Sequence, residues 1–406
     1  MSVPSATLVG ASIDDSTCVR SGRMGELDAV RGIAAFVVVL HHCWQTLLPD
    51  QNTFPFLAAA PLSAGSESAR WAAWINVSPL KLLFSGHAAV GVFFVLSGMV
   101  LTRQLTAQRN RTAYSYRQFV IQRVFRIWVP FALVILMAAG LCAEAGGPLP
   151  QLPWINESWN QPVTWQLVAG HLLMLGASAY VTLDNPMWSL VHEMRISLIF
   201  PVLTRVASLS LPRLVTGAAL LFTLLSISHV TGPLIAWVPG TLSREVLHSL
   251  LDTARYGLFF VLGIALALKG GALQSWLQKR QQALRGALWV LAFALLAVPF
   301  LAGYLELAYA LGATLLLALC TASVTARRLL GFRWLTWLGK VSYSLYLVHL
   351  LVLLTLVHVL RQLMPLQLIL PLAVVSSLVI AELCNRFIEL PANRLGKRLA
   401  GQARSA

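Results

Sequence analysis

The first residues that could do chemistry are three ionisable side chains in one apolar segment. Residues 26–45 read ELDAVRGIAAFVVVLHHCWQ, with Arg31 near one end and His41 and His42 deep in the segment. In an α-helix, Arg31 and His42 would lie about 16 Å apart along the axis. Ionisable groups inside a bilayer are costly and usually face a bundle interior or a water-filled cavity. The histidines therefore indicate either a functional imidazole or a hydrogen bond that packs two helices together.

A later apolar segment carries a carboxylate. The sequence NPMWSLVHEMRISLIFP places Glu193 and Arg195 in a predicted helix, and the residue four positions after Glu193 is a serine, not a cation. A buried carboxylate needs a partner, which must here come from another helix. A histidine beside a carboxylate is the usual arrangement for taking a proton from a hydroxyl. We predict that Glu193 or another buried acid orients His42 as a general base; for Glu193, a structural salt bridge with an intramembrane arginine is the alternative.

Two arginines at a fixed spacing form a third candidate. Arg123 and Arg126 lie three residues apart in YSYRQFVIQRVFRIWVP, so both should share one face of a helix. Guanidinium groups bind phosphate oxygens bidentately, and the pair therefore suits a polyphosphate. The alternative is that these are topogenic arginines that reach toward lipid head groups.

A further set of polar residues lies in LGKVSYSLYLVH. Ser342, Tyr346 and His349 follow one another at spacings of four and three, which puts them near one helix face. They could line a substrate cavity or simply hydrogen-bond neighbouring helices. The sequence contains no CxxC, HExxH, GxSxG or glycine-rich nucleotide motif, and its five cysteines are scattered, so we predict no metal site.

The elements that must position these residues are membrane-spanning helices. Of the 406 residues, 57% are hydrophobic and 11% are charged, with a mean hydropathy of +0.73, whereas soluble domains carry about 25% charged residues. The net charge of +15 is concentrated in short basic segments between long apolar runs. That pattern is typical of the positive-inside rule and argues against nucleic-acid binding.

The fold class that we predict is an all-α polytopic membrane protein. About ten apolar runs are long enough to span a bilayer: residues 27–48, 81–101, 127–145, 187–204, 214–231, 256–270, 286–302, 305–323, 338–360 and 366–388. The basic segments put both termini in the cytoplasm. The short run 164–181 would break this alternation, and we expect a buried or re-entrant helix there.

The expected domain organisation is simple. Residues 1–25 should form a disordered cytoplasmic tail, residues 26–394 a single transmembrane domain, and residues 395–406 a second cytoplasmic tail. Removing the apolar runs leaves no segment of about 100 residues for a separate soluble domain.

Together these segments resemble the membrane-bound acyltransferase 3 family over residues 26–394. The motifs occur in the family's order: RGIAAFVVVLHH, FFVLSG, the RxxR element, WSLxxE ending at Glu193, SYSLYLVH ending at His349, and FIELP. The resemblance implies an O-acyltransferase of the bacterial inner membrane. It would transfer an acyl group, commonly acetyl, from cytoplasmic acyl-CoA to a hydroxyl of a glycan or glycolipid.

The resemblance also implies roles for individual residues. Arg31 and His42 match the family's Arg-x10-His pair, so we expect Arg31 to bind acyl-CoA together with Arg123 and Arg126, while His42 and Glu193 act in catalysis. Pairing with Glu193 or anchoring of the helix are the alternatives for Arg31. Many members have GVDLFF where this chain has AVGVFF, so Gly91 stands where an aspartate is common.

Two other functions fit the same residues. Buried Arg, His and Glu in a bundle of about ten helices also describe a proton-coupled transporter or flippase, although no inverted repeat is visible. The acceptor could also be a small diffusible molecule such as a macrolide. The expected partners of the acyltransferase are membrane lipid, acyl-CoA and the acceptor, with no metal and no nucleic acid.

Overall fold

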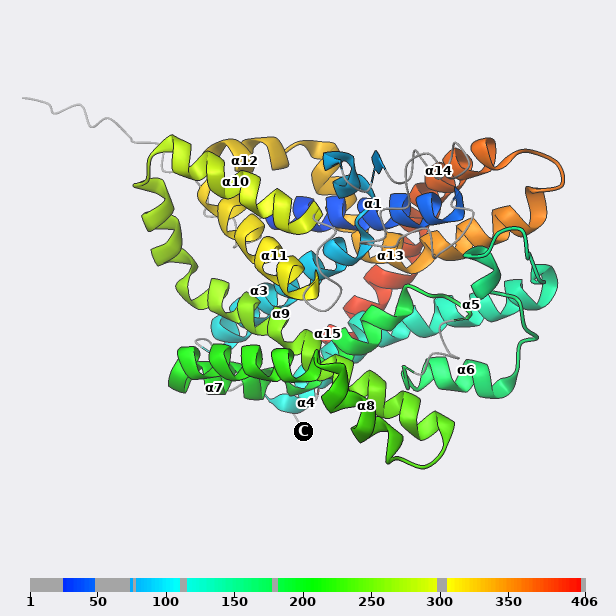
Figure 1. Ribbon diagram of the computed structural model, residues 1–406, viewed down its shortest axis with the longest axis horizontal. Helices are drawn as coiled ribbons and strands as arrows, with labels where there is room; N and C mark the ends of the chain where they lie inside the picture. The colour runs from blue at the N-terminus through cyan, green and yellow to red at the C-terminus, as the bar shows by residue number, and fades with distance from the viewer. Residues whose placement is uncertain are drawn as a thin grey trace, which may run out of the picture.

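The chain folds as a bundle of helices (Figure 1). The structure, a computed structural model, describes residues 25–47, 74–75, 78–109, 115–176, 182–297 and 305–402, which contain no β-strand. The predicted all-α fold is confirmed. The predicted tail over residues 1–25 lies outside the described residues except for its last residue. The elements are α1 Gly25–Leu47, η2 Pro79–Phe84, α3 Gly86–Arg109, α4 Tyr116–Arg123, η3 Val124–Trp128, α5 Val129–Ala145, η4 Ile155–Glu157, α6 Trp165–Leu172, α7 Met187–Leu225, α8 Ser228–Ala236, α9 Thr241–Gln278, α10 Gln282–Ala297, α11 Leu305–Ala322, α12 Val324–Leu330, α13 Arg333–Leu360, α14 Leu366–Cys384, η6 Asn385–Glu389 and α15 Leu390–Gln402.

Among the described residues, seven helical segments are long and apolar enough to cross a membrane, and α11 with α12 makes an eighth if that bent pair is one span. Each of the ten predicted runs overlaps a helix. The predicted run 187–204 lies within α7, whereas the run 214–231 covers the last part of α7 and extends into α8. Between the two runs α7 is kinked at Ser210, where the dihedral angles are non-helical. A third run corresponds to α10, an apolar helix of 16 residues. The chain is thus a multi-pass membrane protein.

The predicted non-spanning segment contains α6. This helix has eight residues and begins at an N-cap, where the Thr164 hydroxyl accepts a hydrogen bond from the Leu167 amide. Eight residues rise about 12 Å, far less than the roughly 30 Å of a hydrocarbon core. Helix α6 packs against α5 instead. Residues 177–181 of this segment lie outside the described residues.

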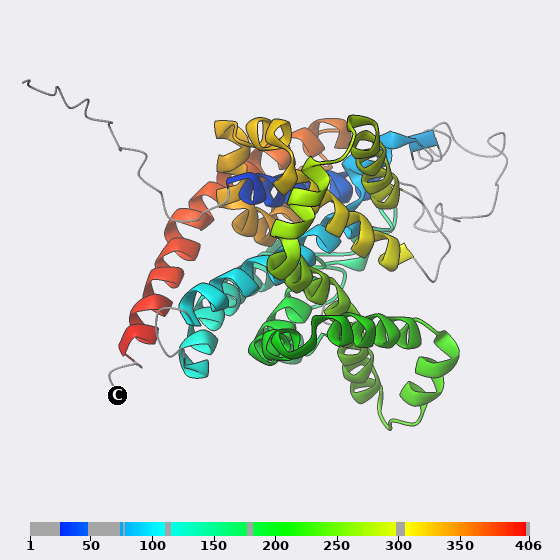
Figure 2. The ribbon, with the colours of Figure 1, turned by 90° about the vertical axis from the view of Figure 1, so that its left-hand side faces the viewer.

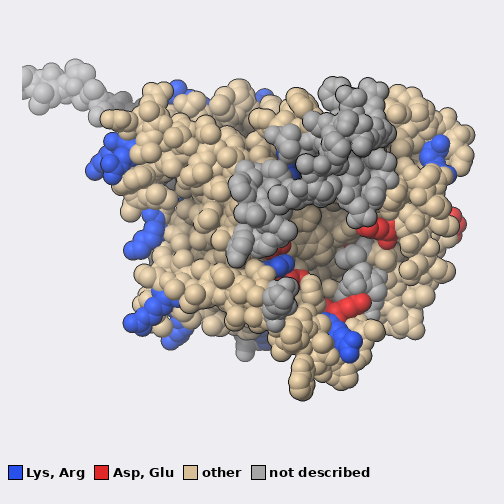
Figure 3. Space-filling model, viewed as in Figure 1, with Lys and Arg blue, Asp and Glu red and all other residues tan. Residues whose placement is uncertain are grey.

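Basic side chains gather at one end of the bundle. In the view of Figure 3, most of the visible Lys and Arg atoms lie along the left-hand edge, whereas the apolar middle carries few. Helices α1 and α13 lie in the middle and right of the same view, at a distance from this basic edge (Figure 1). Turned by 90°, the bundle shows α7 and α8 projecting away from the other helices (Figure 2).

The packing that positions the site depends on glycine contacts. Helices α1 and α13 cross at Gly32 and Gly339, where a Cβ on Gly339 would lie 2.2 Å from the Asp28 carbonyl oxygen. A Cβ on Gly32 would lie 2.5 Å from the Gly339 amide nitrogen. Small residues allow such close approach of backbones within a membrane. The contact holds the start of α1 directly against the start of α13.

Candidate functional site

Arg31 is tied to helix α13. Its Nε donates to the Ser342 hydroxyl at 2.8 Å, and one terminal nitrogen donates to the Gly339 carbonyl at 2.8 Å. The same nitrogen lies 3.5 Å from the carboxylate of Asp28, one turn earlier on α1. The glycine contact brings this carbonyl within reach. Arg31 is therefore held in a fixed orientation at the interface of the two helices.

Five of the predicted site residues share one cavity of about 70 Å³. It lies between α1, α3, α7, α13 and the two π-helical segments η3 and η6. Its lining is mixed, with charged, hydroxyl and aromatic side chains: Arg31, Phe93, Phe94, Ser97, Arg126, Ile127, Ser189, Leu190, Glu193, Ser342, Tyr343, Tyr346 and Glu389. The cavity brings together two arginines and two carboxylates from segments far apart in the sequence.

The two arginines of the RxxR element lie in different surroundings. Arg126 lines the cavity, but Arg123 is buried beside Phe119, with its guanidinium carbon 5.5 Å from the ring centroid, and donates to Gln104 at 3.3 Å. The reason is that the segment from Val124 to Trp128 is a π-helix. Hydrogen bonds from i to i+5 widen the turn, so a spacing of three no longer returns to one face.

A second π-helix supplies a residue that the sequence did not single out. Glu389, at the end of η6, lines the cavity and accepts hydrogen bonds from Ser344 at 2.7 Å and Asn385 at 2.9 Å. The FIELP motif contains this glutamate, but its spacing alone gave it no role. Single π-turns within α-helices occur frequently at functional sites, and here two of them border one cavity.

His42 pairs with His349. The His42 Nδ1 lies 2.8 Å from the His349 Nε2, and the two rings are tilted by only 6°. The His349 Nδ1 lies 3.0 Å from the Leu345 carbonyl and 2.9 Å from the Tyr346 carbonyl. Trp154 stacks on the other side of His42 at a centroid distance of 5.2 Å. This imidazole is half-buried and held on two sides.

These contacts fix the tautomer of both rings. Carbonyl oxygens can only accept, so the His349 Nδ1 carries the proton and its Nε2 is the acceptor. The His42 Nδ1 must then donate to that Nε2. It follows that the neutral His42 keeps its lone pair on Nε2, which is the state a general base needs.

Glu193 is not the partner of His42. Its carboxylate accepts a hydrogen bond from the Ser97 hydroxyl at 2.9 Å and faces the cavity with Arg31 and Arg126. As predicted, the partner of Glu193 comes from another helix, and it is the Ser97 hydroxyl of α3. The hydrogen bond that orients His42 is accepted by His349, whereas a carboxylate was predicted there.

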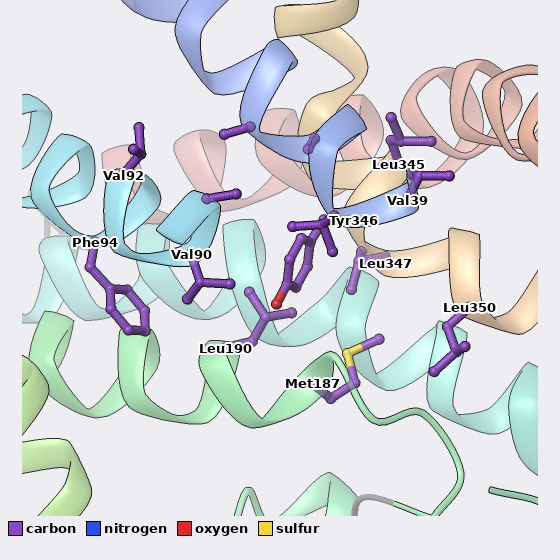
Figure 4. Packing of buried hydrophobic residues seen from close by; sticks show 14 of the residues in the cluster. Val39, Val90, Val92, Phe94, Met187, Leu190, Leu345, Tyr346, Leu347 and Leu350 are labelled. Atoms are coloured by element: carbon purple, nitrogen blue, oxygen red, sulfur yellow. The ribbon is translucent and has the colours of Figure 1, made fainter. Parts of the chain in front are cut away.

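Tyr346 lies between the cavity and the His42–His349 pair. It lines the cavity, and its ring centroid lies 5.9 Å from that of His349. Its hydroxyl donates to the Pro186 carbonyl at 2.9 Å and lies 2.7 Å from the Ser189 hydroxyl. Figure 4 shows the phenol oxygen directed toward α7, beside Leu190. Of the three residues predicted to line a cavity, Ser342 and Tyr346 do so, whereas His349 lies behind Tyr346 and binds His42 instead.

A buried carboxyl group lies in the turn before α7. Asp184 is 0% exposed, and neither of its carboxylate oxygens has a hydrogen-bond partner among the described residues. Burial raises the pKa of Asp184 well above its ordinary value, because removal from water disfavours the charged form. The described residues contain no group of three or more His, Cys, Asp or Glu side chains that could hold a metal ion.

Comparison with known families identifies the class of enzyme. The family model described as an acyltransferase domain matches residues 24–386. The chain belongs to the acyltransferase 3 family. All the predicted site residues and all the cavity-lining residues except Glu389 fall within the matched range.

One curated relative of this acyltransferase is the peptidoglycan O-acetyltransferase OatA of Listeria monocytogenes. The two proteins are 26% identical over 327 residues, which is 77% of this chain and 52% of the relative. The chain therefore spans about half of the relative's length. No solved structure matches the chain.

Proposed function

We propose that this protein is an O-acyltransferase of a bacterial inner membrane that transfers an acyl group, most simply acetyl, from acyl-CoA to a hydroxyl of a glycan or glycolipid. The observation that carries the proposal is the His42–His349 pair, which leaves a lone pair on the His42 Nε2. His42 does not itself line the cavity with the two arginines, but the ring of Tyr346, which does, lies 5.9 Å from the ring of His349. The relative that acts on peptidoglycan supports a glycan of that kind as the acceptor.

The cavity suits the reacting end of the donor. Ligand pockets for whole small molecules usually measure about 300–1,000 Å³, whereas this cavity measures about 70 Å³. The thioester end can enter, but the nucleotide must stay outside. Arg31 and Arg126 hold the donor at this point, because both guanidinium groups line the cavity. Arg123 acts differently: it packs against Phe119 and supports the start of η3.

The proposed chemical step uses His42 as a general base. The acceptor oxygen gives its proton to the His42 Nε2 and attacks the carbonyl carbon of the thioester. The carbon–sulfur bond then breaks, and the thiolate of CoA takes up that proton, so the step is balanced. While His42 is protonated, its Nδ1–H still donates to His349. General base catalysis of this type contributes about 10²- to 10⁴-fold.

The distance between Arg31 and His42 along α1 supports access of donor and acceptor from opposite ends of the bundle. Arg31 and His42 lie about 16 Å apart along the helix axis, about half of the roughly 30 Å hydrocarbon core. A donor from the basic end of the bundle can then meet an acceptor that approaches from the opposite end. This arrangement matches the acylation of a glycan on the far side of the membrane.

The test is acyl transfer by the purified protein in liposomes. Protein, acetyl-CoA and a peptidoglycan fragment should release free thiol and yield an acetylated glycan. The His42→Ala variant should lose at least about 10²-fold in turnover. His41→Ala is the matched control, because the neighbouring His41 bonds to the Phe84 carbonyl at 2.7 Å instead of to His349. Folded His42→Ala protein with normal turnover would exclude the assignment, and absence of glycan-dependent thiol release would exclude the proposed reaction.

A further inference from the structure

A larger cavity lies on the other side of helices α1 and α3. It measures about 220 Å³ and is formed by α1, α3, α9, α11 and α12. Its polar lining includes two arginines, one carboxylate, an amide and a hydroxyl, together with two consecutive glycines of α9: Glu26, Arg103, Arg327, Gln274, Thr321, Gly270 and Gly271. None of these residues lines the acyl-transfer cavity.

Helix geometry shows that the two cavities are distinct. Glu26 and Arg31 are five residues apart on α1, which is a rotation of about 500°, so their side chains point about 140° apart. Ser97 and Arg103 are six residues apart on α3, and their side chains point about 120° apart. Each cavity contains one member of each pair. The paired helices α1 and α3 therefore form a wall between the two cavities.

The lining of the larger cavity suits an anion. Two arginines and one glutamate give a formal lining charge of +2 − 1 = +1. Arg103 comes from α3 and Arg327 from α12, so the two guanidinium groups approach from different elements. A Cβ added to Gly270 or Gly271 would meet no atom within 4 Å, so the α9 side of the cavity is open. Two guanidinium groups bind a phosphate with charge-assisted hydrogen bonds.

The position of α12 points to the level of the lipid head groups. This helix is bent by 95° from the spanning helix α11 and therefore lies across the direction of the span. It exposes Val324 (52%) and Leu329 (56%) next to Arg327 and Arg328. Exposed apolar residues beside cations are typical of a helix that lies in the membrane interface. Basic pockets between helices at that level bind lipid head groups.

We infer that the cavity between Arg103 and Arg327 is a phosphate-binding site, separate from the acyl-transfer site, and that an anionic phospholipid head group occupies it. At about 220 Å³ the cavity is smaller than the usual pocket for a whole small-molecule ligand. It accommodates a phosphate with its immediate substituents, while the acyl chains of the lipid lie along the apolar surface beside α12.

The test compares variants of equal charge change, and Arg327 and its control Arg328 lie on the same helix. The full-length protein in neutral detergent is titrated with phosphatidylglycerol or phosphatidylcholine, and the thermal unfolding midpoint gives the apparent Kd. Phosphatidylglycerol should stabilise the wild type, and Arg103→Gln or Arg327→Gln should weaken its binding about tenfold or more. Arg328→Gln, which removes the same charge from a residue outside the cavity, should change the Kd less than about twofold.

A fourth variant should change the lipid affinity in the opposite direction. Glu26→Gln should tighten binding, because it removes the anion from the lining. Inorganic phosphate and ADP form the second arm: if they stabilise the protein through the same two arginines and phosphatidylglycerol does not, the phosphate site stands and its ligand is soluble. If neither ligand depends on Arg103 and Arg327, or if Arg328→Gln has an equal effect, the inference is wrong. The opposite sign of Glu26→Gln keeps the test decisive even where an arginine variant folds poorly.

Discussion

The role of His349 gives the sharpest test of the proposed mechanism. Replacing His349 with leucine removes the acceptor that lies 2.8 Å from the His42 Nδ1. A buried donor left without an acceptor costs about 1–3 kcal/mol. The His42 ring can avoid this cost by moving its proton to Nε2, but the base is then lost. Since about 1.4 kcal/mol corresponds to a factor of ten in rate, we expect kcat to fall about ten- to a hundredfold.

The assay is acetyl-CoA-dependent thiol release in liposomes, measured at several donor concentrations. Donor KM should change less than about twofold, because His349 does not line the donor cavity. His349→Gln is the matched variant: its amide oxygen can accept the Nδ1–H, so it should recover much of the lost kcat. Equal kcat for the leucine and glutamine variants, or a leucine variant as active as the wild type, would refute the role of His349 in fixing the tautomer.

Three further predictions follow from the geometry. Arg126→Ala should raise the donor KM about tenfold or more, whereas Arg123→Ala should mainly lower stability, because only Arg126 lines the cavity. Steady-state kinetics measure the first effect and thermal unfolding the second, and identical effects of both variants would contradict the assignment of Arg126 alone to donor binding. Gly339→Ala would place a Cβ 2.2 Å from a carbonyl oxygen of α1 and should lower the free energy of unfolding by about 1–3 kcal/mol. Gly140→Ala is the control: its Cβ would have nothing within 4 Å, so it should be neutral or stabilising. Unfolding midpoints test this, and a Gly339→Ala variant as stable as the control would be inconsistent with the contact. The folded-state pKa of Asp184 is raised, so the wild type keeps full stability below about pH 4, where the carboxyl is protonated in both states, and loses stability as pH rises toward the folded pKa. Asp184→Asn should therefore raise Tm by a few degrees at pH 7 and leave it unchanged in acid. An equal Tm of both proteins across this pH range would show that burial does not destabilise the charged carboxyl.

The sequence predicted the class of fold well, because long apolar runs can form only spanning helices in a bilayer. It was less informative where helices bend. The runs 187–204 and 214–231 are separated by Arg205 and Pro212, and α7 is kinked at Ser210 in this gap. Hydropathy does not show that the second run is broken between the end of α7 and the start of α8. Short α10 and bent α12 likewise depend on packing against neighbouring helices, which periodicity does not record.

For the site, the sequence singled out individual residues. Arg31, Arg126, Glu193, Ser342 and Tyr346 line one cavity, and the roles assigned to them stay predictions. The partners within the site were harder to predict, because a hydrogen bond such as His42 to His349 joins residues 307 positions apart. A sequence shows which residues need partners but not which helices are adjacent.

The π-helical segments mean that chain length matters here as much as residue identity. A π-turn holds one residue more than the α-turn that it replaces, so deletion of a single residue would restore a regular helix. The helix beyond the turn would keep its orientation, because the five residues of a π-turn advance about as far around the axis as four residues of an α-helix. Arg126 lies inside the η3 turn, so its direction would change relative to both flanking helices and it would leave the cavity that it lines. A shortening by one residue would thus remove this arginine from the site while the surrounding helices stayed in place.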